Sequence, residues 1–395
     1  MNFDPHKTST STGERNRRWA ATMQGYDGPI RLAHADSRGF IGPPNTDKHL
    51  VLSTDIAGFT RKDREELENL ALAPGATRSG GVSTRKRQED PDPWRTCFEQ
   101  DRDRILHASA FRRLSGKTQV FIFPEDHQRT RLTHALEVAQ VATSIARACN
   151  LNVSLTEAIA LGHDCGHGPG GHASEDALGP YLSDGFDHAR WGADVSLSSL
   201  NLCAETLDGI RNHSWSLPAP STPEGEVVSW ADRIAYVCHD WEDAVRSRIV
   251  SENLLPEIVR TRCGVHRGAQ LGTFITAVIT TTLESRRVGM DEETAETLGA
   301  FRSTNYKHIY LREESLVQGE TVIRLLRALV DYYSEHSDAI PIAQEDQGIR
   351  ECEDPVNLAV TYVAGMTDRF AFRQAASLLG WDPSKLPNGI DISKP

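Results

Sequence analysis

The chain has 395 residues, of which 38% are hydrophobic and 25% charged, a composition expected of a globular protein with one large or two moderate domains. A formal net charge of -12 argues against a general nucleic-acid binder, although local basic clusters can still hold phosphates. Seven scattered cysteines without a Cys-x-x-Cys pair indicate reduced thiols, and no stretch is apolar enough for a signal core or a membrane span. We therefore expect a cytoplasmic protein with no membrane association.

The first third of the chain predicts few regular elements. Residues 1–63 are largely polar, without a sustained apolar period, which predicts a flexible extension. A short helix is expected over 61–72, then a Gly-, Ser- and Pro-rich linker over 73–81. Residues 101–114 predict a helix with an apolar stripe made of Ile105, Ala108, Phe111 and Leu114. Residues 117–124 resemble a short extended segment, which is either a small hairpin element or simply a loop.

A long helix is predicted over residues 131–149, which contain neither Gly nor Pro. Its predicted apolar stripe consists of Leu132, Leu136, Ala139, Ala142 and Ile145. His134 lies off this stripe and by itself suggests a surface histidine. Arg131, about one turn earlier on roughly the same face, makes a charged site the competing interpretation.

Residues 163–175 are the most chemically loaded stretch, with three histidines and two acids. Adjacent residues of a regular helix point about 100° apart, so His163 and Asp164 can reach one ion only at a helix end or turn. Four glycines permit such a turn: Gly166, Gly168, Gly170 and Gly171. Imidazole and carboxylate together suit Mn, Fe, Co, Ni or Zn better than Mg. The alternative is a helix end followed by a Gly-rich surface loop.

Residues 226–245 predict another helix, on which Asp232, Tyr236 and Asp240 form one polar line at steps of four. This line is either a solvated acidic face or, with Arg233 beside it, the wall of a pocket. Earlier, residues 201–213 predict a helix of weak chemical content. His188 is equally a substrate contact or a packed loop histidine.

The C-terminal third is predicted to be helical over 271–283, 314–333 and 354–379, the last with a proline in its first turn. Neither a Rossmann glycine fingerprint nor a P-loop occurs, and we detect no internal repeat. The predicted fold is therefore mainly α.

Four of these side chains follow one another in the order H…HD…D, namely His134, His163, Asp164 and Asp232. This pattern resembles the HD-domain phosphohydrolase superfamily, in which these four positions hold a metal inside a helical bundle. A finer resemblance, to the deoxyguanosinetriphosphate triphosphohydrolase (dGTPase) family, covers about residues 64–380. It rests on the blocks 101–107, 110–114, 117–121, 129–134, 163–175, 206–210, 231–236 and 364–369.

The resemblance implies an all-α HD-domain bundle over 64–250 and a helical phosphohydrolase-associated region over 251–395. It implies cleavage of a deoxynucleoside triphosphate to deoxynucleoside and inorganic triphosphate, with a divalent ion, Mn or Mg, or else Fe, Co, Ni or Zn. His172 and Glu175 match the catalytic acid/base pair. The positions predicted to bind substrate are Arg131, His167, His188, Arg233, Tyr236, Asp240, Arg302 and Tyr310, with Arg113 and Lys117 as weaker phosphate candidates.

Family likeness further implies a homo-oligomer, a hexamer, with a nucleotide or single-stranded nucleic acid as a possible effector. Two positions depart from the family pattern: Gly170 stands where a bulky aromatic is common, and Ala189 where an Asn is usual. Two other functions remain open. One is a different HD-type reaction, on nucleoside monophosphates or (p)ppGpp, and the other is a non-catalytic nucleotide- or nucleic-acid-binding regulator.

Overall fold

The computed structural model describes residues 58–80, 84–124, 128–341 and 354–387, together with two strands near the N-terminus. The chain divides into two compact units, residues 1–58 and 59–395. In the first unit, β1 (His34–Ala35) pairs antiparallel with β2 (Ile41–Gly42). Apart from these strands, the predicted flexible extension up to residue 57 lies outside the described residues. All described helices belong to the second unit, and the predicted all-α fold is confirmed.

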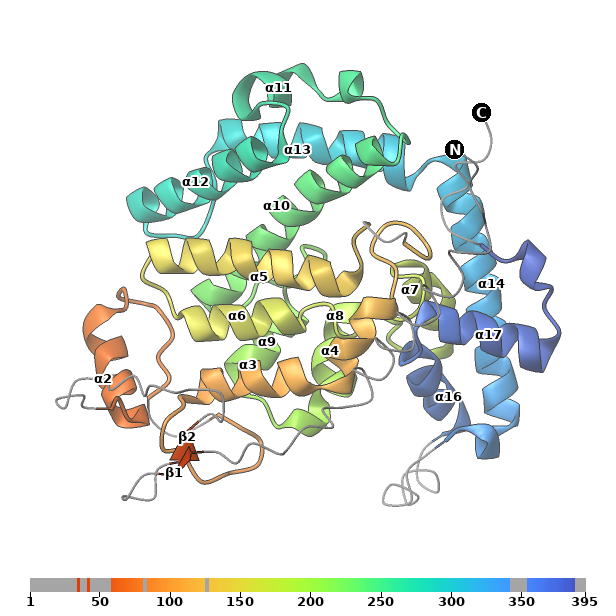
Figure 1. Ribbon diagram of the computed structural model, residues 1–395, viewed down its shortest axis with the longest axis horizontal. Helices are drawn as coiled ribbons and strands as arrows, with labels where there is room; N and C mark the ends of the chain where they lie inside the picture. The colour runs from red at the N-terminus through yellow and green to blue at the C-terminus, as the bar shows by residue number, and fades with distance from the viewer. Residues whose placement is uncertain are drawn as a thin grey trace, which may run out of the picture. The chain divides into compact units, whose positions relative to one another are not determined.

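The larger of two hydrophobic cores lies among the helices of the N-terminal half of the second unit. Figure 1 shows α3, α6 and α5 in successive layers, and α10 packs against α5 and α6. A capping box starts α2, α3 and α5, with Thr60, Thr96 and Thr130 at the respective N-caps. The helices of this part are α2 (Arg61–Ala71), α3 (Cys97–His107), α4 (Ser109–Arg113), α5 (Arg131–Ala148), α6 (Val153–Gly162), α8 (His188–Trp191), α9 (Ala204–Arg211) and α10 (Pro223–Arg246).

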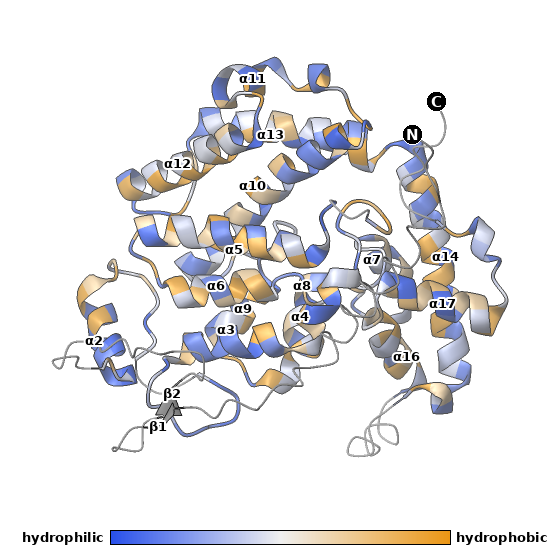
Figure 2. Cartoon of the chain, in the orientation of Figure 1, coloured by the Kyte–Doolittle hydropathy of each residue, from blue (hydrophilic) through white to orange (hydrophobic). Residues whose placement is uncertain are grey.

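Three helices cover α10 on the side away from α6, and their apolar residues join the same core. They are α11 (Glu257–Cys263), α12 (Arg267–Ser285) and α13 (Glu292–Asn305). Figure 2 shows hydrophobic and hydrophilic residues alternating along these helices, as expected for elements that bury one face. A π-helical turn, Tyr306–Tyr310 (η6), continues α13.

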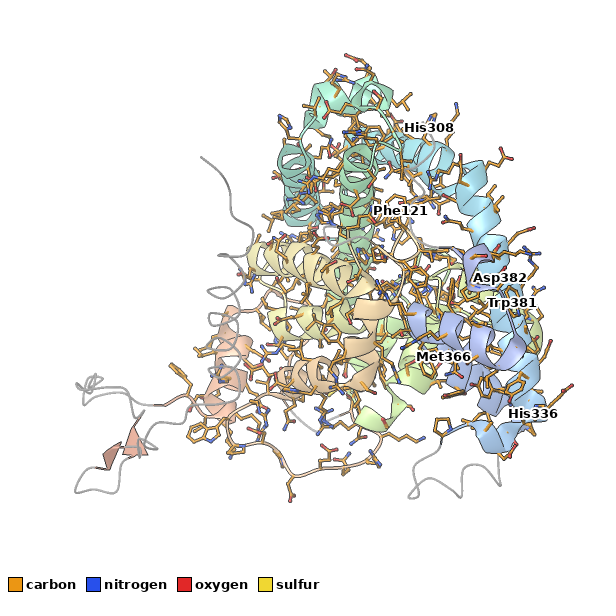
Figure 3. The ribbon with its side chains drawn as sticks, turned by 45° about the vertical axis from the view of Figure 1, so that its right-hand side comes forward. Phe121, His308, His336, Met366, Trp381 and Asp382 are labelled. Carbon is orange, nitrogen blue, oxygen red and sulfur yellow. The ribbon has the colours of Figure 1, made fainter. Side chains whose placement is uncertain are left out.

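A second hydrophobic core is built from the C-terminal helices and α7. α14 runs alongside α16, α17 and α7 in Figure 1. Met366 lies at the turn between α16 and α17, and Phe121 lies between the two groups of helices in Figure 3. The helices are α7 (Ala173–Leu178), α14 (Glu313–Glu335), α16 (Pro355–Ala364) and α17 (Asp368–Leu379).

Two predicted helices are interrupted in the structure. The helix predicted over 101–114 is broken where Ala108 adopts an extended backbone, with ψ of 144°. The helix predicted over 354–379 ends at Ala364 and restarts at Asp368. Of the two interpretations of residues 117–124, the structure has the loop, and its one β-bridge joins Thr118 to Thr130. In each case tertiary contacts override local propensity.

The linker predicted over 73–81 is a fixed connection as far as residue 80. The guanidinium of Arg78 donates hydrogen bonds to the carbonyls of Leu72, Ala73 and Ala76. The six cysteines within the described ranges are free thiols, whereas Cys352 lies outside them. In the same ranges, every helix is too short or too polar to cross a bilayer.

Candidate active site and metal centre

The N-terminal turn of α5 carries the first two site residues. Arg131 opens the helix and is 1% exposed, and His134, one turn later, is 2% exposed. By contrast, Leu136 on the predicted apolar stripe is 49% exposed. The predicted helix is therefore confirmed, but the face assigned as buried was partly wrong, because the polar side chains of the site occupy the true inner face.

The end of α6 presents the adjacent pair. α6 stops at Gly162, and the chain turns so that His163 and Asp164 both face His134. The ring Nδ1 of His163 donates to the carbonyl of Ala160 at 2.7 Å, which leaves its buried Nε2 without a protein partner. This is the arrangement by which a metal-binding histidine is usually oriented.

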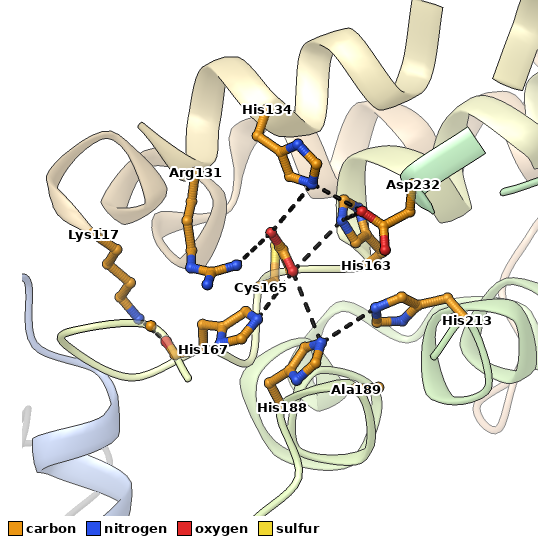
Figure 4. A network of polar contacts seen from close by, with 12 residues as sticks. Lys117, Arg131, His134, His163, Cys165, His167, His188, Ala189, His213 and Asp232 are labelled. Atoms are coloured by element: carbon orange, nitrogen blue, oxygen red, sulfur yellow. Dashed lines mark hydrogen bonds and ion pairs between the residues drawn. The ribbon is translucent and has the colours of Figure 1, made fainter. Parts of the chain in front are cut away.

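Asp232 completes a cluster of four side chains from α5, the α6 end and α10 (Figure 4). Its Oδ1 lies 2.9 Å from Nε2 of His134 and 3.7 Å from Nε2 of His163. Asp164 Oδ1 lies 3.5 Å from the same His163 nitrogen, and its Oδ2 is 4.0 Å from His134 Nε2. Two imidazole nitrogens and two carboxylates in this arrangement fit a divalent first-row ion. The cluster predicted from sequence is thus assembled.

Positive neighbours keep both acids of the cluster charged. Burial alone would raise the pKa of Asp164, but His163, Arg131 and His167 hold it well below its ordinary value. Burial also opposes ionisation of Asp232, yet its hydrogen bond to His134 and its electrostatic interaction with the nearby His163 lower its pKa. Both carboxylates are therefore ionised near neutral pH and available as ligands.

Arg131 combines an ion pair with unused donors. Its Nη1 donates to Asp164 Oδ2 at 2.7 Å, while its buried Nε and Nη2 have no hydrogen-bond partner. An unpaired buried N–H is costly, and the guanidinium lines a cavity of about 910 Å³. These free donors suit an anionic group such as a phosphate.

Three histidines lie close together beside the metal pair: His167 and His172 from the loop that follows it, and His188 from the start of α8. The rings of His167 and His188 stack with centroids 3.7 Å apart, and the His172 ring lies 5.0 Å from His167 and 5.7 Å from His188. His172 is open to the cavity, yet the surrounding protein and the charge of Arg131 lower its pKa to about 4. His172 is thus a neutral base near pH 7.

The side chains of His172 and Glu175, predicted to form a couple, are not hydrogen-bonded to each other. Glu175 Oε1 instead accepts from the ring Nδ1 of His188 and, at 3.1 Å, from the backbone N–H of His188. The backbones come close at this point: a Cβ on Gly166 would lie 2.0 Å from the carbonyl oxygen of His188. This close approach explains the need for glycine at position 166, two residues after Asp164.

The predicted sugar-side residues of the cavity come from α10 and from the end of α13 with its π-helical turn. Arg302 Nε donates to the Tyr236 hydroxyl at 2.8 Å, and the Tyr310 hydroxyl donates to Asp240 Oδ2 at 2.5 Å. Burial raises the pKa of Asp240 to about 7. Arg233 lies with its guanidinium 3.4 Å from the ring centroid of Trp215. All predicted site residues except His163 and Glu175 line this one cavity.

Two weaker phosphate candidates do not line the cavity. Lys117 is 3% exposed and donates to the carbonyls of His167 and Ala364. Arg113, likewise, is absent from the lining. Neither side chain lines the cavity, and burial lowers the pKa of Lys117 to about 7.

Sequence reasoning missed His213 and Trp215, which follow the end of α9. His213 is 2% exposed, with its Nε2 3.2 Å from that of His188. Trp215 lines the cavity and packs edge-on against Trp230. The only local signal was a histidine and a tryptophan after a helix end, which carries no spacing information about the distant metal ligands.

Comparison with known proteins agrees with this geometry. A family model described as HD domain matches residues 131–237, and one described as phosphohydrolase-associated domain matches residues 288–377. The solved structure of a phosphohydrolase from Bacteroides thetaiotaomicron aligns with 69% of this chain and 68% of its own at 16% identity and a TM-score of 0.43. That likeness is too distant to inform the site.

Sequence relatives are much closer. A deoxyguanosinetriphosphate triphosphohydrolase-like protein from Caldanaerobacter subterraneus is 42% identical over 318 residues, which cover 79% of this chain and 93% of the relative. A protein of the same name from Clostridium perfringens is 38% identical over 327 residues, covering 78% of this chain and 94% of the relative. The chain is a phosphohydrolase with an HD domain, and it belongs to the deoxyguanosinetriphosphate triphosphohydrolase-like family.

Proposed function

We propose that the protein hydrolyses a deoxynucleoside triphosphate to the deoxynucleoside and inorganic triphosphate, with a divalent ion such as Mn or Mg. The observation that carries the proposal is the composition of one cavity of about 910 Å³. Its lining combines residues of the histidine and aspartate cluster and the free donors of Arg131 with the hydroxyl groups of Tyr236 and Tyr310, the carboxyl group of Asp240 and the guanidinium of Arg302. A triphosphate ester of a sugar needs these same kinds of partner.

At the phosphate end, Arg131 binds the triphosphate through the two nitrogens that have no protein partner. His134, His163, Asp164 and Asp232 would hold the divalent ion, which would supply Lewis acidity and make a nearby water easier to deprotonate. In the proposed reaction a bond forms between water oxygen and the α-phosphorus, and the bond from that phosphorus to the 5′ oxygen breaks. One water proton ends on the 5′ oxygen.

His172 is the proposed acid/base group, because its pKa of about 4 leaves a free ring nitrogen open to the cavity near pH 7. Glu175 does not line the cavity and holds His188, so we assign it as a positioning residue. His167 and His188, stacked beside it, complete the phosphate side of the site.

At the sugar end we propose that Tyr236 packs against the deoxyribose and that Asp240 and Tyr310 accept or donate hydrogen bonds to its hydroxyl group. Arg302 and Arg233 would contact the phosphates from this wall. Family likeness adds three further proposals: a homo-oligomer, a hexamer; a nucleotide or single-stranded nucleic acid as effector; and a cytoplasmic location.

The direct test incubates the purified full chain with Mn²⁺ or Mg²⁺ and each of the four deoxynucleoside triphosphates, and separates the products by ion-exchange chromatography. We expect deoxynucleoside and triphosphate. Release of orthophosphate or pyrophosphate, or turnover only of nucleoside monophosphates or (p)ppGpp, would contradict the proposal and support another HD-type reaction. Nucleotide binding without any product would favour the alternative function, a non-catalytic nucleotide- or nucleic-acid-binding regulator.

A variant separates chemistry from binding. Glu175→Gln keeps the size of the side chain but weakens its hold on His188, so we expect kcat to fall at least tenfold while KM and the affinity for a non-hydrolysable analogue change less than twofold. Glu335→Gln, exposed at the end of α14, is the control and should match wild type. Equal activity in the Glu175 variant would remove this residue from the mechanism.

A further inference from the structure

Arg233, a cation of the cavity lining, is held by an aromatic ring instead of a carboxylate. Its Cζ lies 3.4 Å from the centroid of the Trp215 ring. In the described part of the chain Arg233 forms no ion pair, and its buried Nε has no hydrogen-bond partner. An aromatic face attracts a guanidinium without neutralising its charge. Arg233 therefore keeps both its charge and a donor for an anion in the cavity.

Arg129 shows the opposite arrangement. Its guanidinium forms ion pairs with three carboxylates, those of Glu137, Glu242 and Asp243. Most of its charge is thereby balanced within the protein. Arg129 does not line the cavity, whereas Arg233 does, so the arginine without an acidic partner is the one that faces the ligand space.

The Trp215 ring is itself held in place by α10. Trp215 lies in the chain between α9 and α10 and is 49% exposed. Its ring meets that of Trp230 edge-on, with centroids 4.8 Å apart and planes at 82°. Trp230 and Arg233 are three positions apart on α10, so they share one face of this helix. One loop residue thus packs on two side chains of the helix that carries Asp232.

A second cation of the cavity has a similar environment. The Cζ of Arg302 lies 4.3 Å from the centroid of the Tyr306 ring, and its Nε donates to the Tyr236 hydroxyl at 2.8 Å. Within the described ranges Arg302 forms no ion pair either. Arg302 and Arg233 both line the cavity, so aromatic groups support these two cations without cancelling the charge that an anionic ligand needs.

We infer that Trp215 is a positioning residue that holds the Arg233 guanidinium ready for the phosphate groups of the substrate. An arginine side chain loses rotamer freedom when it binds an anion, and the stack on Trp215 removes that cost beforehand. The ring face that Arg233 covers is closed to a nucleobase, so Trp215 acts through Arg233 and not by stacking on the base. The inference rests on the proposed function only for the identity of the phosphorylated substrate.

A double-variant cycle tests whether Trp215 acts through Arg233. The full chain in saturating Mn²⁺ is titrated with inorganic triphosphate by calorimetry. We expect Trp215→Leu to raise the Kd about three- to tenfold, the size of effect that ordering one long side chain has on binding. Trp215→Phe retains a ring under the guanidinium and should restore most of the affinity. In an Arg233→Gln background, Trp215→Leu should change the Kd less than about twofold.

Two controls distinguish positioning from a general loss of structure. Trp94→Leu removes a tryptophan that is 58% exposed and does not line the cavity, and it should bind triphosphate as wild type does. The affinity for each deoxynucleoside should be the same in Trp215→Leu and wild type, because Arg233 serves the phosphates. Weaker deoxynucleoside binding with unchanged triphosphate binding would overturn the inference and favour stacking of the base on Trp215.

Fluorescence gives a second measurement that does not depend on the folding of Trp215→Leu. The emission of Trp215 is the difference between the spectra of wild type and Trp215→Phe. Saturating triphosphate should change this emission, since the anion binds the guanidinium that lies on the ring, and the change should be absent in Arg233→Gln. An emission that triphosphate leaves unaltered would contradict the inference.

An unchanged Kd for triphosphate in Trp215→Leu would also overturn the inference, and so would an equal loss with and without Arg233. The products of turnover judge the proposed function separately. Deoxynucleoside and triphosphate as products, with an unchanged Kd in Trp215→Leu, would refute only the role of Trp215. Other products, with the expected coupling between Trp215 and Arg233, would refute only the proposed function.

Discussion

The carboxylate of Asp368 accepts a hydrogen bond from the backbone N–H of Gly170 at 2.9 Å, which ties the first turn of α17 to the loop that carries His172. Its other oxygen accepts from the backbone N–H of Thr118 at 2.9 Å and from the Thr118 hydroxyl at 2.5 Å. A buried residue of the C-terminal helices thus holds two segments of the cavity wall.

Replacement of Asp368 by Asn should loosen this wall. The amide has one acceptor oxygen, so its NH₂ group must face a backbone N–H, and an unsatisfied buried donor costs about 1–3 kcal/mol. We expect a loss of about that size in the free energy of unfolding, with faster hydrogen exchange at residues 168–172. The control Asp338→Asn, at an exposed position, should change neither the free energy of unfolding nor the hydrogen exchange of that loop. Unchanged exchange in that loop would contradict the role of Asp368.

Replacement of Arg131 by Lys should weaken binding of triphosphate. Lysine retains the charge that pairs with Asp164 but lacks the second and third nitrogens that the guanidinium aims at the cavity. Loss of charge-assisted hydrogen bonds worth about 1.4–2.8 kcal/mol corresponds to a 10- to 100-fold higher Kd. Calorimetry with inorganic triphosphate measures it, with metal content as control. An unaltered Kd would mean that the anion binds elsewhere.

Stability should depend on pH through Asp240. Burial raises the pKa of Asp240 to about 7 against the hydrogen bond from Tyr310, so the native state binds more protons than the unfolded state between about pH 4 and 7. The stability that this protonation supplies is complete below pH 4 and is lost as pH rises through 7. The free energy of unfolding of Asp240→Asn should therefore rise by about 2–4 kcal/mol relative to that of wild type between pH 4 and 8.

Denaturant unfolding of the metal-free protein at several pH values measures that difference. Tyr310→Phe removes the hydrogen bond that opposes the shift, so it should move the transition to higher pH. A difference between wild type and Asp240→Asn that stays constant from pH 4 to 8 would exclude a buried, protonated Asp240.

Gly170 should tolerate no side chain without a change in α14. Its φ is +75°, and a Cβ would lie 2.5 Å from Cγ1 of Val322. Gly380 has a similar φ of +67° with open space around it, so Gly380→Ala reports the backbone cost alone, about 1 kcal/mol. We expect Gly170→Ala to cost 1–3 kcal/mol more.

The double variant Gly170→Ala with Val322→Ala should be more stable than the sum of its single effects, because the smaller residue makes room for the new methyl group. Equilibrium unfolding of the four proteins measures this coupling. Strict additivity would show that Val322 is not the obstacle.

That His134, His163, Asp164 and Asp232 come together could be predicted from sequence, because each lies on, or at the end of, a helix whose local pattern is clear. The burial of His134 could not, since apolar periodicity in α5 favoured Leu136, which is 49% exposed. A helix that buries polar ligands hides its inner face from a count of hydrophobic residues. Only the H…HD…D pattern as a whole indicated that the face of α5 with His134 points inward.

The break between α16 and α17 illustrates a second limit. Residues 354–379 read as one helix, yet the chain turns at Gly365–Thr367, and Asp368 bonds to Thr118 and Gly170. These partners are 250 and 198 positions away in the chain. His213 was missed for the same reason, because its significance comes from His188 and not from its own neighbours.

The π-helical turn after α13 limits which sequence changes the site can tolerate. In η6 the N–H of Leu311 bonds to the carbonyl of Tyr306, five positions back, so the turn holds one residue more than an α-helix would. Deleting that residue would swing everything beyond it by about 100° around the helix axis. Tyr310 would leave Asp240, and α14 would meet α7 with another face. Point substitutions can therefore change the shape of this cavity wall without moving the helices. Deletion of one residue, by contrast, disrupts both the pocket and the second hydrophobic core at once.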